Sequence, residues 1–415
     1  MTRETVFTYA APQLKFGAGA ADEIGYDLSQ LGARRVLVIT DAGVSAVGAP
    51  QRVAEAMRRF GVEAEVFAGV HVEPTDASMR QAVEAAHAGG PWDAFVAVGG
   101  GSCIDTAKVV NLLTTNPGDL MEYLNPPVGA GRAPERPLKP LVAVPTTTGT
   151  GAESTTVCVL DVLSLKLKTG ISHARLRPTL AVVDPLLTVT QPPEVTAASG
   201  MDILCHALES YTAKPYTAYD AKEPHQRVPY CGANPVADMW AEKALSLLAR
   251  SLCTAVAHGD DLAARTDMAM AATFAGMGFG NAGVHIPHAN AYPIAGGVHD
   301  YHPSGYPEGE PLVPHGMAVA LTAPEAFRFT HPSDPERHRR AARLLGGEDL
   351  PATLTALMRD IGIPNGIGAV GYGEGDIDTL VAGALKQQRL LTTAPLPVTE
   401  KDLAGIFERS VSLWE

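Results

Sequence analysis

The sequence predicts an α/β domain over residues 1–190, followed by a mostly helical domain over residues 191–415. In the first half, short apolar runs alternate with segments of helical spacing, which is typical of a parallel sheet with crossover helices. After about Pro185 the pattern changes to longer helical segments rich in Ala, Leu and Met. A chain of 415 residues is long enough for two domains with a large core.

The individual elements follow from these patterns. Apolar runs predict strands at 35–40, 63–68, 94–98, 141–144 and 180–183. Helical spacing predicts helices at 50–60, 79–88, 104–113, 195–211, 235–257, 262–278 and 335–345. Segments 212–234 and 295–314 are rich in Pro, Tyr, His and Gly, and we predict long loops there, a kind of segment that often serves function.

The composition restricts the partners and the compartment. A net charge of -13 argues against a nucleic acid or a membrane surface as partner, because both are polyanionic. The five cysteines are scattered and form no Cys-x-x-Cys pair, which indicates free thiols in a reducing compartment. The sequence has no signal-peptide pattern and no run of eighteen apolar residues. We therefore expect a cytoplasmic protein.

A glycine-rich turn, residues 99–102 (GGGS), lies between a predicted strand and a predicted helix. Glycine lets backbone N–H groups approach a phosphate closely, and a helix N-terminus adds a favourable partial positive charge. The turn matches neither the G-x-G-x-x-G fingerprint nor a P-loop, and a plain strand-to-helix turn is the alternative. Asp105 and Lys108, one and two turns further on, favour a diphosphate-binding role.

Two other features are compatible with a dinucleotide. Residues 145–151 form a hydroxyl-rich loop after a predicted strand, although a solvent-exposed loop explains them equally well. Asp41, at a strand end, could bond ribose hydroxyls and would repel a 2′-phosphate, which favours NAD over NADP. Taken alone, an Asp in that position is more often a helix cap.

One acid and several histidines predict a metal site in the second half. Asp202 and His206 are four residues apart in a helical segment, so their side chains share one helical face. Five of the thirteen histidines fall between His285 and His315. Carboxylate plus imidazole is a ligand set that iron and zinc accept. Taken singly, Asp202 is better explained as a helix cap and His206 as a core histidine, so the combination carries the prediction.

Together these pieces resemble the group III, iron-dependent alcohol dehydrogenase family. The matching stretches are GGGSCIDTAK (99–108), PTTTGTGAE (145–153), DILCHALE (202–209), the histidine segment and PHG (314–316). They span most of the chain and occur in the family's order. The resemblance implies an N-terminal Rossmann-like domain and an all-α C-terminal domain, a fold shared with dehydroquinate synthase.

The resemblance also implies which residues form the site. The implied metal ligands are Asp202, His206, His288 and His315, with Fe²⁺ or alternatively Zn²⁺ as the ion. The predicted NAD-binding residues are Asp41, Gly99, Gly100, Gly101, Ser102, Asp105, Thr146, Thr147 and Lys168. His285 is the alternative to His288. Where the family has a second histidine in His-x-x-x-His-Pro, this chain has Tyr292, so Tyr292 is one candidate catalytic residue. Lys168 is the other.

Longer stretches resemble the hydroxyacid–oxoacid transhydrogenase branch of that family. They are VEPTD (72–76), GMDILCHALESYTAKPY (200–216), CGANPVADMW (231–240), FGNAGVHIPHANAYPIAG (279–296) and PLVPHGMAV (311–319). This resemblance implies that 4-hydroxybutyrate is oxidised to succinate semialdehyde while 2-oxoglutarate is reduced to 2-hydroxyglutarate through a held nicotinamide. A homodimer is implied as well. Because the chain starts close to its first strand, without the leader of the animal members, we expect a bacterial cytoplasmic protein.

Alternative functions stay open at this point. A related reductase could act on another small acidic aldehyde, such as a phosphonate aldehyde. A lyase resembling dehydroquinate synthase would need more basic residues and another ligand trio, and a metal hydrolase would have no use for the glycine turn. We expect an anionic small-molecule substrate whose carboxylate is bound by one or more cations near the site. The candidates are Lys168, Arg175, Arg177, Lys214, Lys222 and Arg227.

Overall fold

The computed structural model describes residues 2–165, 167–306, 309 and 311–415. Its contacts divide the chain into two compact units. The α/β unit comprises Ala11–Gln191, and the helical unit combines Met1–Ala10 with Pro192–Glu415. The change of pattern that we located near residue 190 therefore falls next to the point where one unit ends and the other begins.

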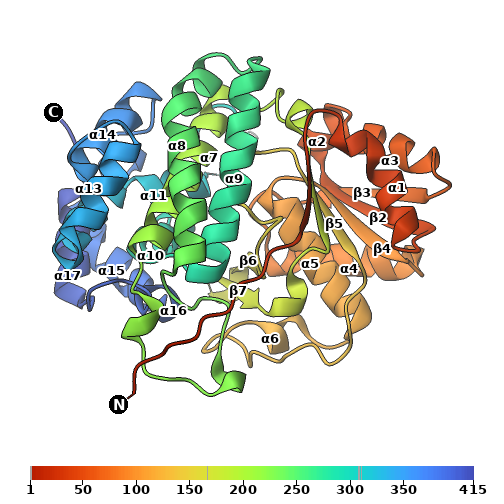
Figure 1. The fold of residues 1–415 in the computed structure, drawn as a ribbon, viewed down its shortest axis with the longest axis horizontal. Coiled ribbons are helices and arrows are strands. Elements are labelled where there is room, and N and C mark those ends of the chain that lie inside the picture. Colours follow the sequence, from red (N-terminus) through yellow and green to blue (C-terminus); the bar gives the residue numbers. More distant parts are fainter. Residues whose placement is uncertain (1, 166, 307–308, 310) are drawn as a thin grey trace. The chain divides into compact units, whose positions relative to one another are not determined.

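Ala11–Gln191 form a six-stranded sheet with helices on both of its faces (Figure 1). The strand order is β1-β8-β5-β4-β2-β3, and each neighbouring pair is parallel. The strands are β1 (Gln13–Phe16), β2 (Arg35–Asp41), β3 (Glu63–Val70), β4 (Ala94–Gly99), β5 (Leu141–Pro145) and β8 (Leu180–Val183). All five predicted strands belong to this sheet, so the predicted fold class is confirmed for this half.

Both faces of the sheet are buried, which explains its continuous apolar strands. Successive side chains of a strand point to opposite faces. Val36 and Val38 of β2 accordingly belong to one apolar core, and Leu37 and Ile39 belong to the other. The first core includes residues of α1 (Ile24–Gln30) and α3 (Ala49–Arg58), and the second includes residues of α4 (Asp76–Gly89) and α5 (Gly101–Thr115). The short helices of this unit are α2 (Ala42–Ala46) and α6 (Leu120–Tyr123).

An antiparallel hairpin in this unit was not predicted. It consists of β6 (Val157–Val162) and β7 (Leu167–Ser172), which pair with each other and not with the main sheet. The strand β7 contains Lys168, Thr169 and Gly170, so it lacks the apolar run by which the other strands were recognised. The short strand β1 was missed because it is only half-buried and polar in part.

The helical unit is built around three long helices. These are α7 (Pro193–Thr212), α8 (Pro235–Ala257) and α9 (Leu262–Ala282), and all three were predicted with small differences at their ends. The remaining helices are α10 (Ile286–Gly296), α11 (His315–Ala320), α12 (Ala323–Thr330), α13 (Pro335–Leu344), α14 (Leu350–Asp360), α15 (Ile377–Leu385), α16 (Gln388–Leu391) and α17 (Glu400–Arg409). Of these, only α13 was predicted, because short helices interrupted by Pro and Gly show few turns of apolar spacing. The predicted loop 295–314 begins inside α10, and its residues 307, 308 and 310 lie outside the described residues.

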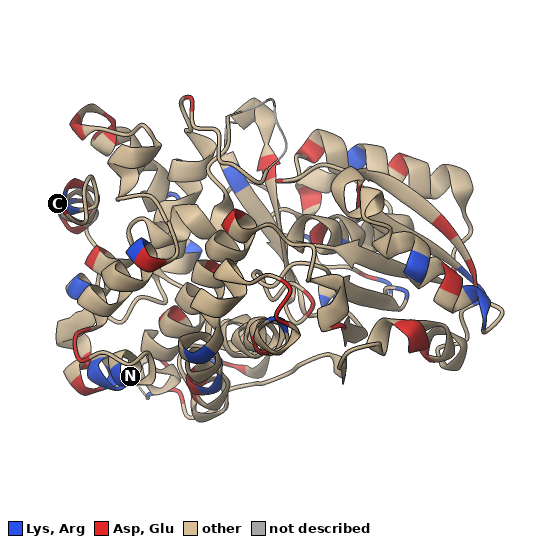
Figure 2. Ribbon diagram, turned by 90° about the horizontal axis from the view of Figure 1, so that it is seen from above, with Lys and Arg blue, Asp and Glu red and all other residues tan. Residues whose placement is uncertain are grey.

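Charged residues of both signs are distributed along the elements rather than gathered on one of them (Figure 2). The chain has 32 Lys and Arg against 45 Asp and Glu. Within the described residues, every helix is too short or too polar to cross a lipid bilayer.

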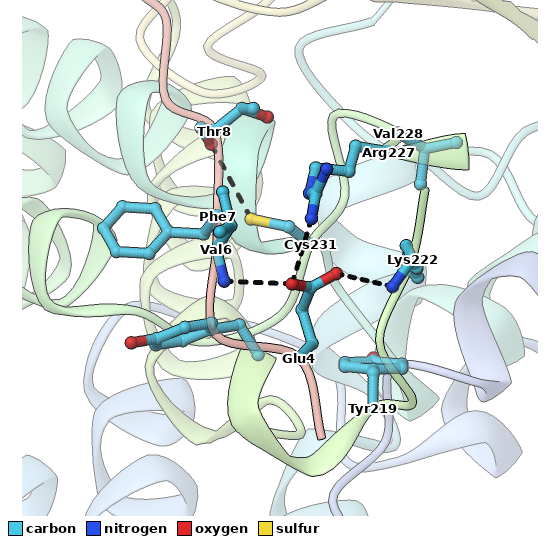
Figure 3. A pocket seen from close by; sticks show the side chains of 10 residues that line it. Glu4, Val6, Phe7, Thr8, Tyr219, Lys222, Arg227, Val228 and Cys231 are labelled. Carbon is cyan, nitrogen blue, oxygen red and sulfur yellow. Dashed lines mark hydrogen bonds and ion pairs between the residues drawn. The ribbon is translucent and has the colours of Figure 1, made fainter. Parts of the chain in front are cut away.

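Residues 2–10 pack on the helical unit, whereas we predicted residues 1–190 as the α/β domain. The backbone N–H of Glu4 donates to the carbonyl of Tyr219 at 3.0 Å. The Glu4 carboxylate accepts hydrogen bonds from the N–H of Lys222 at 3.0 Å and from Nη2 of Arg227 at 3.2 Å (Figure 3). The prediction was wrong because an extended segment held by such polar contacts has no apolar period that would link it to a distant part of the chain.

The lowered pKa of Glu4 predicts that the stability of the protein depends on pH. The N–H of Val6, together with Arg227 and Lys222, lowers the pKa of Glu4 from 4.5 to about 2, although desolvation opposes the shift. A carboxyl group whose pKa is depressed by folding stabilises the protein above its unfolded pKa and loses that effect as the pH falls through its folded pKa. We therefore expect Glu4→Gln to lower the urea midpoint at pH 7, and the difference from the parent to shrink as the pH falls from about 4.5 toward 2. Glu84→Gln, at an exposed position of α4, is the control. A difference that is unchanged down to the acid limit of the folded protein would contradict this assignment.

Candidate functional site

Helix α7 holds the predicted acid and the first histidine on one buried face. Asp202 and His206 are 2% and 4% exposed, so water competes little for their ligand atoms. Their spacing of four residues places one above the other on the helix, and Oδ1 of Asp202 lies 3.8 Å from Nδ1 of His206.

The other two histidines come from α10 and α11. His288 lies in the first turn of α10, and its Nε2 is 3.5 Å from Oδ1 of Asp202. His315 begins α11, and its Nε2 is 3.9 Å from the same oxygen. The approach of α11 to α7 requires Gly316, because a Cβ there would lie 2.2 Å from the carbonyl oxygen of Ala198. The structure thus brings all four predicted ligands around one carboxylate oxygen.

The spacing of these atoms suits a divalent ion. The ligand atoms of Asp202, His206 and His288 all lie within 4.8 Å of one another. Around a tetrahedral ion with bonds of about 2.1 Å, neighbouring ligand atoms are roughly 3.4 Å apart. Oδ1 of Asp202 is buried without a hydrogen-bond partner, and a buried carboxylate oxygen in that state is costly unless a cation or a donor satisfies it. The residues present therefore fit a metal ion.

The electrostatics of the cluster hold Asp202 and His206 in the forms that bind a metal, whereas His288 must give up a proton to bind one. Burial alone would raise the pKa of Asp202, but the imidazoles of His206, His315 and His288 outweigh it and lower the pKa, so the carboxylate stays ionised. Burial lowers the pKa of His206 to about 3, which keeps its imidazole neutral. At His288, burial is outweighed by the carboxylates of Glu209 and Asp202, which raise the pKa to about 9. This cluster attracts positive charge.

Glu209 fixes the orientation of His288. It is fully buried one turn beyond His206 on α7, and its Oε1 lies 2.5 Å from Nδ1 of His288. Its Oε2 accepts the backbone N–H of His285 at 2.5 Å. When Nδ1 of His288 donates to this carboxylate, Nε2 is left to face the cluster. His285, the alternative ligand, instead has its Nε2 3.1 Å from Oγ1 of Thr212.

Two aromatic rings border the histidines. Tyr292 is buried four residues after His288 on α10, and its ring centre lies 6.4 Å from that of His315 at an angle of 89°. Phe279, at the end of α9, stacks on His206 with ring centres 3.9 Å apart and 8° between the planes. We did not predict a role for Phe279, because a single aromatic residue in an apolar helix is indistinguishable by sequence from a core residue.

The glycine turn of the α/β unit joins β4 to α5, as predicted. Helix α5 begins at Gly101 and has no side-chain cap, so its first N–H groups are available to an anion. The hydroxyl-rich loop packs against the turn: the N–H of Thr146 donates to the carbonyl of Gly99 at 3.1 Å. A Cβ on Gly100 would lie 2.9 Å from Oγ1 of Thr147, so this approach requires glycine. The two predicted phosphate-binding loops are therefore in contact with each other.

The polar side chains near the turn form hydrogen bonds within the α/β unit. Asp41 caps α2 by accepting the N–H of Val44 at 2.9 Å, and its other oxygen accepts the Cys103 thiol at 3.2 Å. Asp105 accepts the N–H of Val159 at 2.8 Å, which attaches the hairpin to α5. Ser102 accepts the N–H of Glu73 at 3.2 Å. The sequence did not indicate the contact of Cys103 with Asp41, which lies beneath the turn.

Lys168 of the hairpin lies between two carboxylates. Its Nζ is 2.7 Å from Oε2 of Glu73 and 2.7 Å from Oδ2 of Asp161. Burial would lower the pKa of Lys168, but Glu73 and Asp161 outweigh it and raise the pKa. The ammonium group is therefore held in its charged form and neutralised by these two acids, which leaves it unsuited to removing a proton.

Two of the cations proposed for a substrate carboxylate have other partners in the helical unit. Arg227 pairs with Glu4 at 3.2 Å, and Nζ of Lys214 lies 4.4 Å from the centre of the Tyr219 ring. These contacts indicate that Arg227 and Lys214 belong to the segment that holds the N-terminal residues in place.

The chain belongs to the iron-containing alcohol dehydrogenase family. The model of that family matches residues 11–185, and the model of the C-terminal part of Fe-containing alcohol dehydrogenases matches residues 228–411. The protein is accordingly an oxidoreductase of the iron-type alcohol dehydrogenase class.

Individual similar proteins show which branch of the family the chain resembles. The chain is 44% identical over 427 residues to the mitochondrial hydroxyacid-oxoacid transhydrogenase of Bos taurus, covering 100% of this chain and 91% of the relative. A solved structure of 1,3-propanediol oxidoreductase superposes with a TM-score of 0.86 at 33% identity, covering 98% and 100% of the two chains. Sulfoacetaldehyde reductase from Bifidobacterium kashiwanohense, solved in complex with NAD+, superposes with a TM-score of 0.83 at 27% identity, covering 98% and 99%. The predicted family and its transhydrogenase branch are confirmed.

The predicted cytoplasmic location is wrong. The transhydrogenases of Bos taurus, Rattus norvegicus, Mus musculus and Homo sapiens, all 43% or 44% identical to this chain, are named as mitochondrial. Free thiols are typical of reducing compartments in general, so they do not distinguish the cytoplasm from the others.

Proposed function

We propose that this protein is a metal-dependent, NAD-linked hydroxyacid–oxoacid transhydrogenase. It would oxidise a small hydroxy acid such as 4-hydroxybutyrate to its semialdehyde and reduce an oxo acid such as 2-oxoglutarate. The observation that carries the proposal is the convergence of three histidine nitrogens on the buried, unbonded Oδ1 of Asp202. The 44% identity to a named transhydrogenase over the whole chain supports the choice of substrates.

Asp202, His206, His288 and His315 would hold the ion, which we propose to be Fe²⁺, with Zn²⁺ as the alternative for the same ligand set. When bound, the ion supplies Lewis acidity to the oxygen of the alcohol or carbonyl group. The four side chains supply one negative charge, so the filled site keeps a net positive charge. Burial of all but His315 excludes most water from this side of the ion.

The dinucleotide would be NAD, bound by Gly99, Gly100, Gly101 and Ser102 with Thr146 and Thr147. NAD supplies the hydride acceptor and donor. The uncapped start of α5 supports a diphosphate here. Asp41 would disfavour a 2′-phosphate by charge repulsion, even while it caps α2. Asp105 would support the turn from behind by holding the hairpin, and Lys168 would support it by holding Glu73, whose N–H bonds Ser102 of the turn.

Tyr292 would carry the alcohol proton away from the site. It replaces the second histidine of the family pattern, and it follows His288 by one helical turn on α10. A phenol can donate and accept a hydrogen bond, so it can pass a proton where the family uses an imidazole. Asp202 is ionised and held by the imidazoles, which leaves it unsuited to the same task.

A reductase of another small acidic aldehyde is the second candidate. The similarity to sulfoacetaldehyde reductase supports it, because that enzyme is named for an aldehyde with an anionic group. In both candidates the substrate is a small anion. We further propose a homodimer, which light scattering of the purified protein would test.

The deciding experiment measures hydride exchange without added coenzyme. Iron-loaded protein is mixed with 4-hydroxybutyrate and 2-oxoglutarate, and succinate semialdehyde and 2-hydroxyglutarate are quantified. We expect equal amounts of both products with no NAD+ supplied, and no semialdehyde above enzyme concentration when 2-oxoglutarate is left out. Product formation only with added NAD+ would reject the transhydrogenase in favour of a dehydrogenase. Rapid NADH-dependent reduction of sulfoacetaldehyde, with no turnover of 4-hydroxybutyrate, would favour the second candidate.

A further inference from the structure

A cavity of about 240 Å³ lies at the amino-terminal edge of the sheet in the α/β unit. Its walls come from α5, from the segment that leads into β5 and from the segment that leads into β8. The lining residues are Asn111, Pro137, Leu138, Lys139, Leu141, Arg175, Leu176, Arg177 and Thr179. The glycine turn follows the carboxyl end of β4, and parallel strands have their carboxyl ends at the same edge. The strand β5 has five residues, and at about 3.3 Å per residue it separates the two edges by roughly 16 Å. The cavity is therefore separate from the proposed coenzyme turn.

The walls of this cavity are held in place by hydrogen bonds. The side chain of Asn111, from α5, donates to the carbonyl of Lys139 at 2.8 Å and accepts its N–H at 3.0 Å. The N–H of Thr179 donates to the carbonyl of Leu141 at 2.8 Å, and Oγ1 of Thr179 accepts the N–H of Leu141 at 3.3 Å. Both segments are thus fixed before any ligand binds, which reduces the entropy that binding would cost.

The charge on the walls has one sign. Lys139, Arg175 and Arg177 line the cavity, and no Asp or Glu is among its lining residues. Nζ of Lys139 donates to the carbonyl of Trp92, and Nη1 of Arg175 donates to the carbonyl of Pro134 at 2.7 Å. A carbonyl oxygen occupies one N–H but leaves the positive charge in place. An ammonium has three N–H donors and a guanidinium has five, so both groups retain donors for a ligand.

Neighbouring groups respond to these charges. Burial lowers the pKa of His173, and the positive charge of Arg175 lowers it further. The N–H groups of Arg34 and Arg35 lower the pKa of Asp93, and the charge of Lys139 adds to that effect. Asp93 is held by those two N–H groups at 2.9 Å each and is not among the lining residues.

We propose that this cavity binds a small organic dianion that carries phosphate or carboxylate groups. Arginine binds both groups through paired N–H donors, and lysine adds a point charge. Leu138, Leu141 and Leu176 also line the cavity, so a short carbon chain can pack beside the charged ends. The site is independent of the proposed redox function, because it uses none of the residues assigned to the metal or the coenzyme.

Calorimetric titration of iron-loaded protein saturated with NAD+ tests the proposal, because the coenzyme then occupies the glycine turn. Inorganic phosphate and glutarate serve as separate probes of the anionic group. Because glutarate resembles the proposed substrate 2-oxoglutarate, only the binding that the cavity variant loses is assigned to the cavity. We expect Lys139→Gln/Arg175→Gln to weaken binding of at least one probe by about tenfold or more. Arg58→Gln/Arg59→Gln, at the end of α3, removes the same charge from the same unit and should bind like the parent.

Equal binding of both probes by the cavity variant and the parent would overturn the proposal, as would absence of binding by the parent at probe concentrations up to about 10 mM. If the double variant has a lowered melting temperature, the single variant Arg175→Gln decides the matter. Arg175 is exposed, so its replacement is compatible with folding, and undiminished affinity in that variant would equally reject the site.

Discussion

Replacement of Asp202 by Asn is expected to lower kcat/KM for alcohol oxidation by about 1000-fold or more, because several kcal/mol of charge stabilisation depend on the bound ion. Asn keeps the shape of the side chain but removes the single negative charge among the four ligands. Nε2 of His288 and Nε2 of His315 lie 3.5 Å and 3.9 Å from Oδ1 of Asp202. Without the carboxylate, these neutral rings would share a buried site with a cation whose charge nothing offsets. Metal analysis of the purified variant should show most of the ion lost.

An exposed acid in the same unit provides the control for this prediction. Asp378→Asn, in α15, makes the same chemical change without touching the cluster, and it should keep both metal and activity. Thermal unfolding without metal should be similar for the parent and the Asp202→Asn variant, which separates loss of the ion from loss of the fold. Full metal content together with activity within about tenfold of the parent would contradict the assignment of Asp202 as a ligand.

The pairing of Asp202 with His206 in the proposed metal site could be predicted from the sequence for a simple physical reason. Asp202 and His206 lie on one helix, so their separation of four residues is enough to place them on one face. The choice between His285 and His288 is different, because it depends on where α10 begins. The helix starts at Ile286, so His285 stays outside it and contacts Thr212, while His288 lies inside it and faces Asp202. That boundary is set by tertiary contacts such as those of Glu209, which no local pattern contains.

The α/β half shows the same division between local and long-range information. Its central strands are buried on both faces, so their apolar runs identify them directly. The hairpin that carries Lys168 was missed, because its polar residues are satisfied by partners far away in sequence. One of these partners is Glu73, 95 residues earlier. A residue's chemical type could thus be assigned from the sequence, whereas the charge partners that decide its role could not.

Replacement of Glu209 by Gln is expected to weaken metal binding by about 10–100-fold without removing a ligand. The Glu209 carboxylate is fully buried and accepts two short hydrogen bonds, one from the ring of His288 and one from the backbone of His285, each at 2.5 Å. Gln has one acceptor oxygen, so its amide NH₂ must face one of these two donors. Either the His288 ring loses the partner that keeps Nε2 toward the ion, or the turn before α10 loses its anchor. Charge-assisted bonds are also roughly twice as strong as neutral ones, so the bond that survives is weaker.

Chelator competition measures this effect, because it reports the affinity for the ion separately from the chemical step. Glu194→Gln, in the exposed first turn of the same helix, is the matched control and should bind metal like the parent. If Glu209 positions His288, excess Fe²⁺ should restore much of the lost activity, since the four ligands are still present. A purely structural role predicts another outcome, in which the melting temperature of the metal-free protein falls while the affinity for the ion stays unchanged. That result would remove Glu209 from the proposed site and leave the orientation of His288 to the backbone of α10 alone.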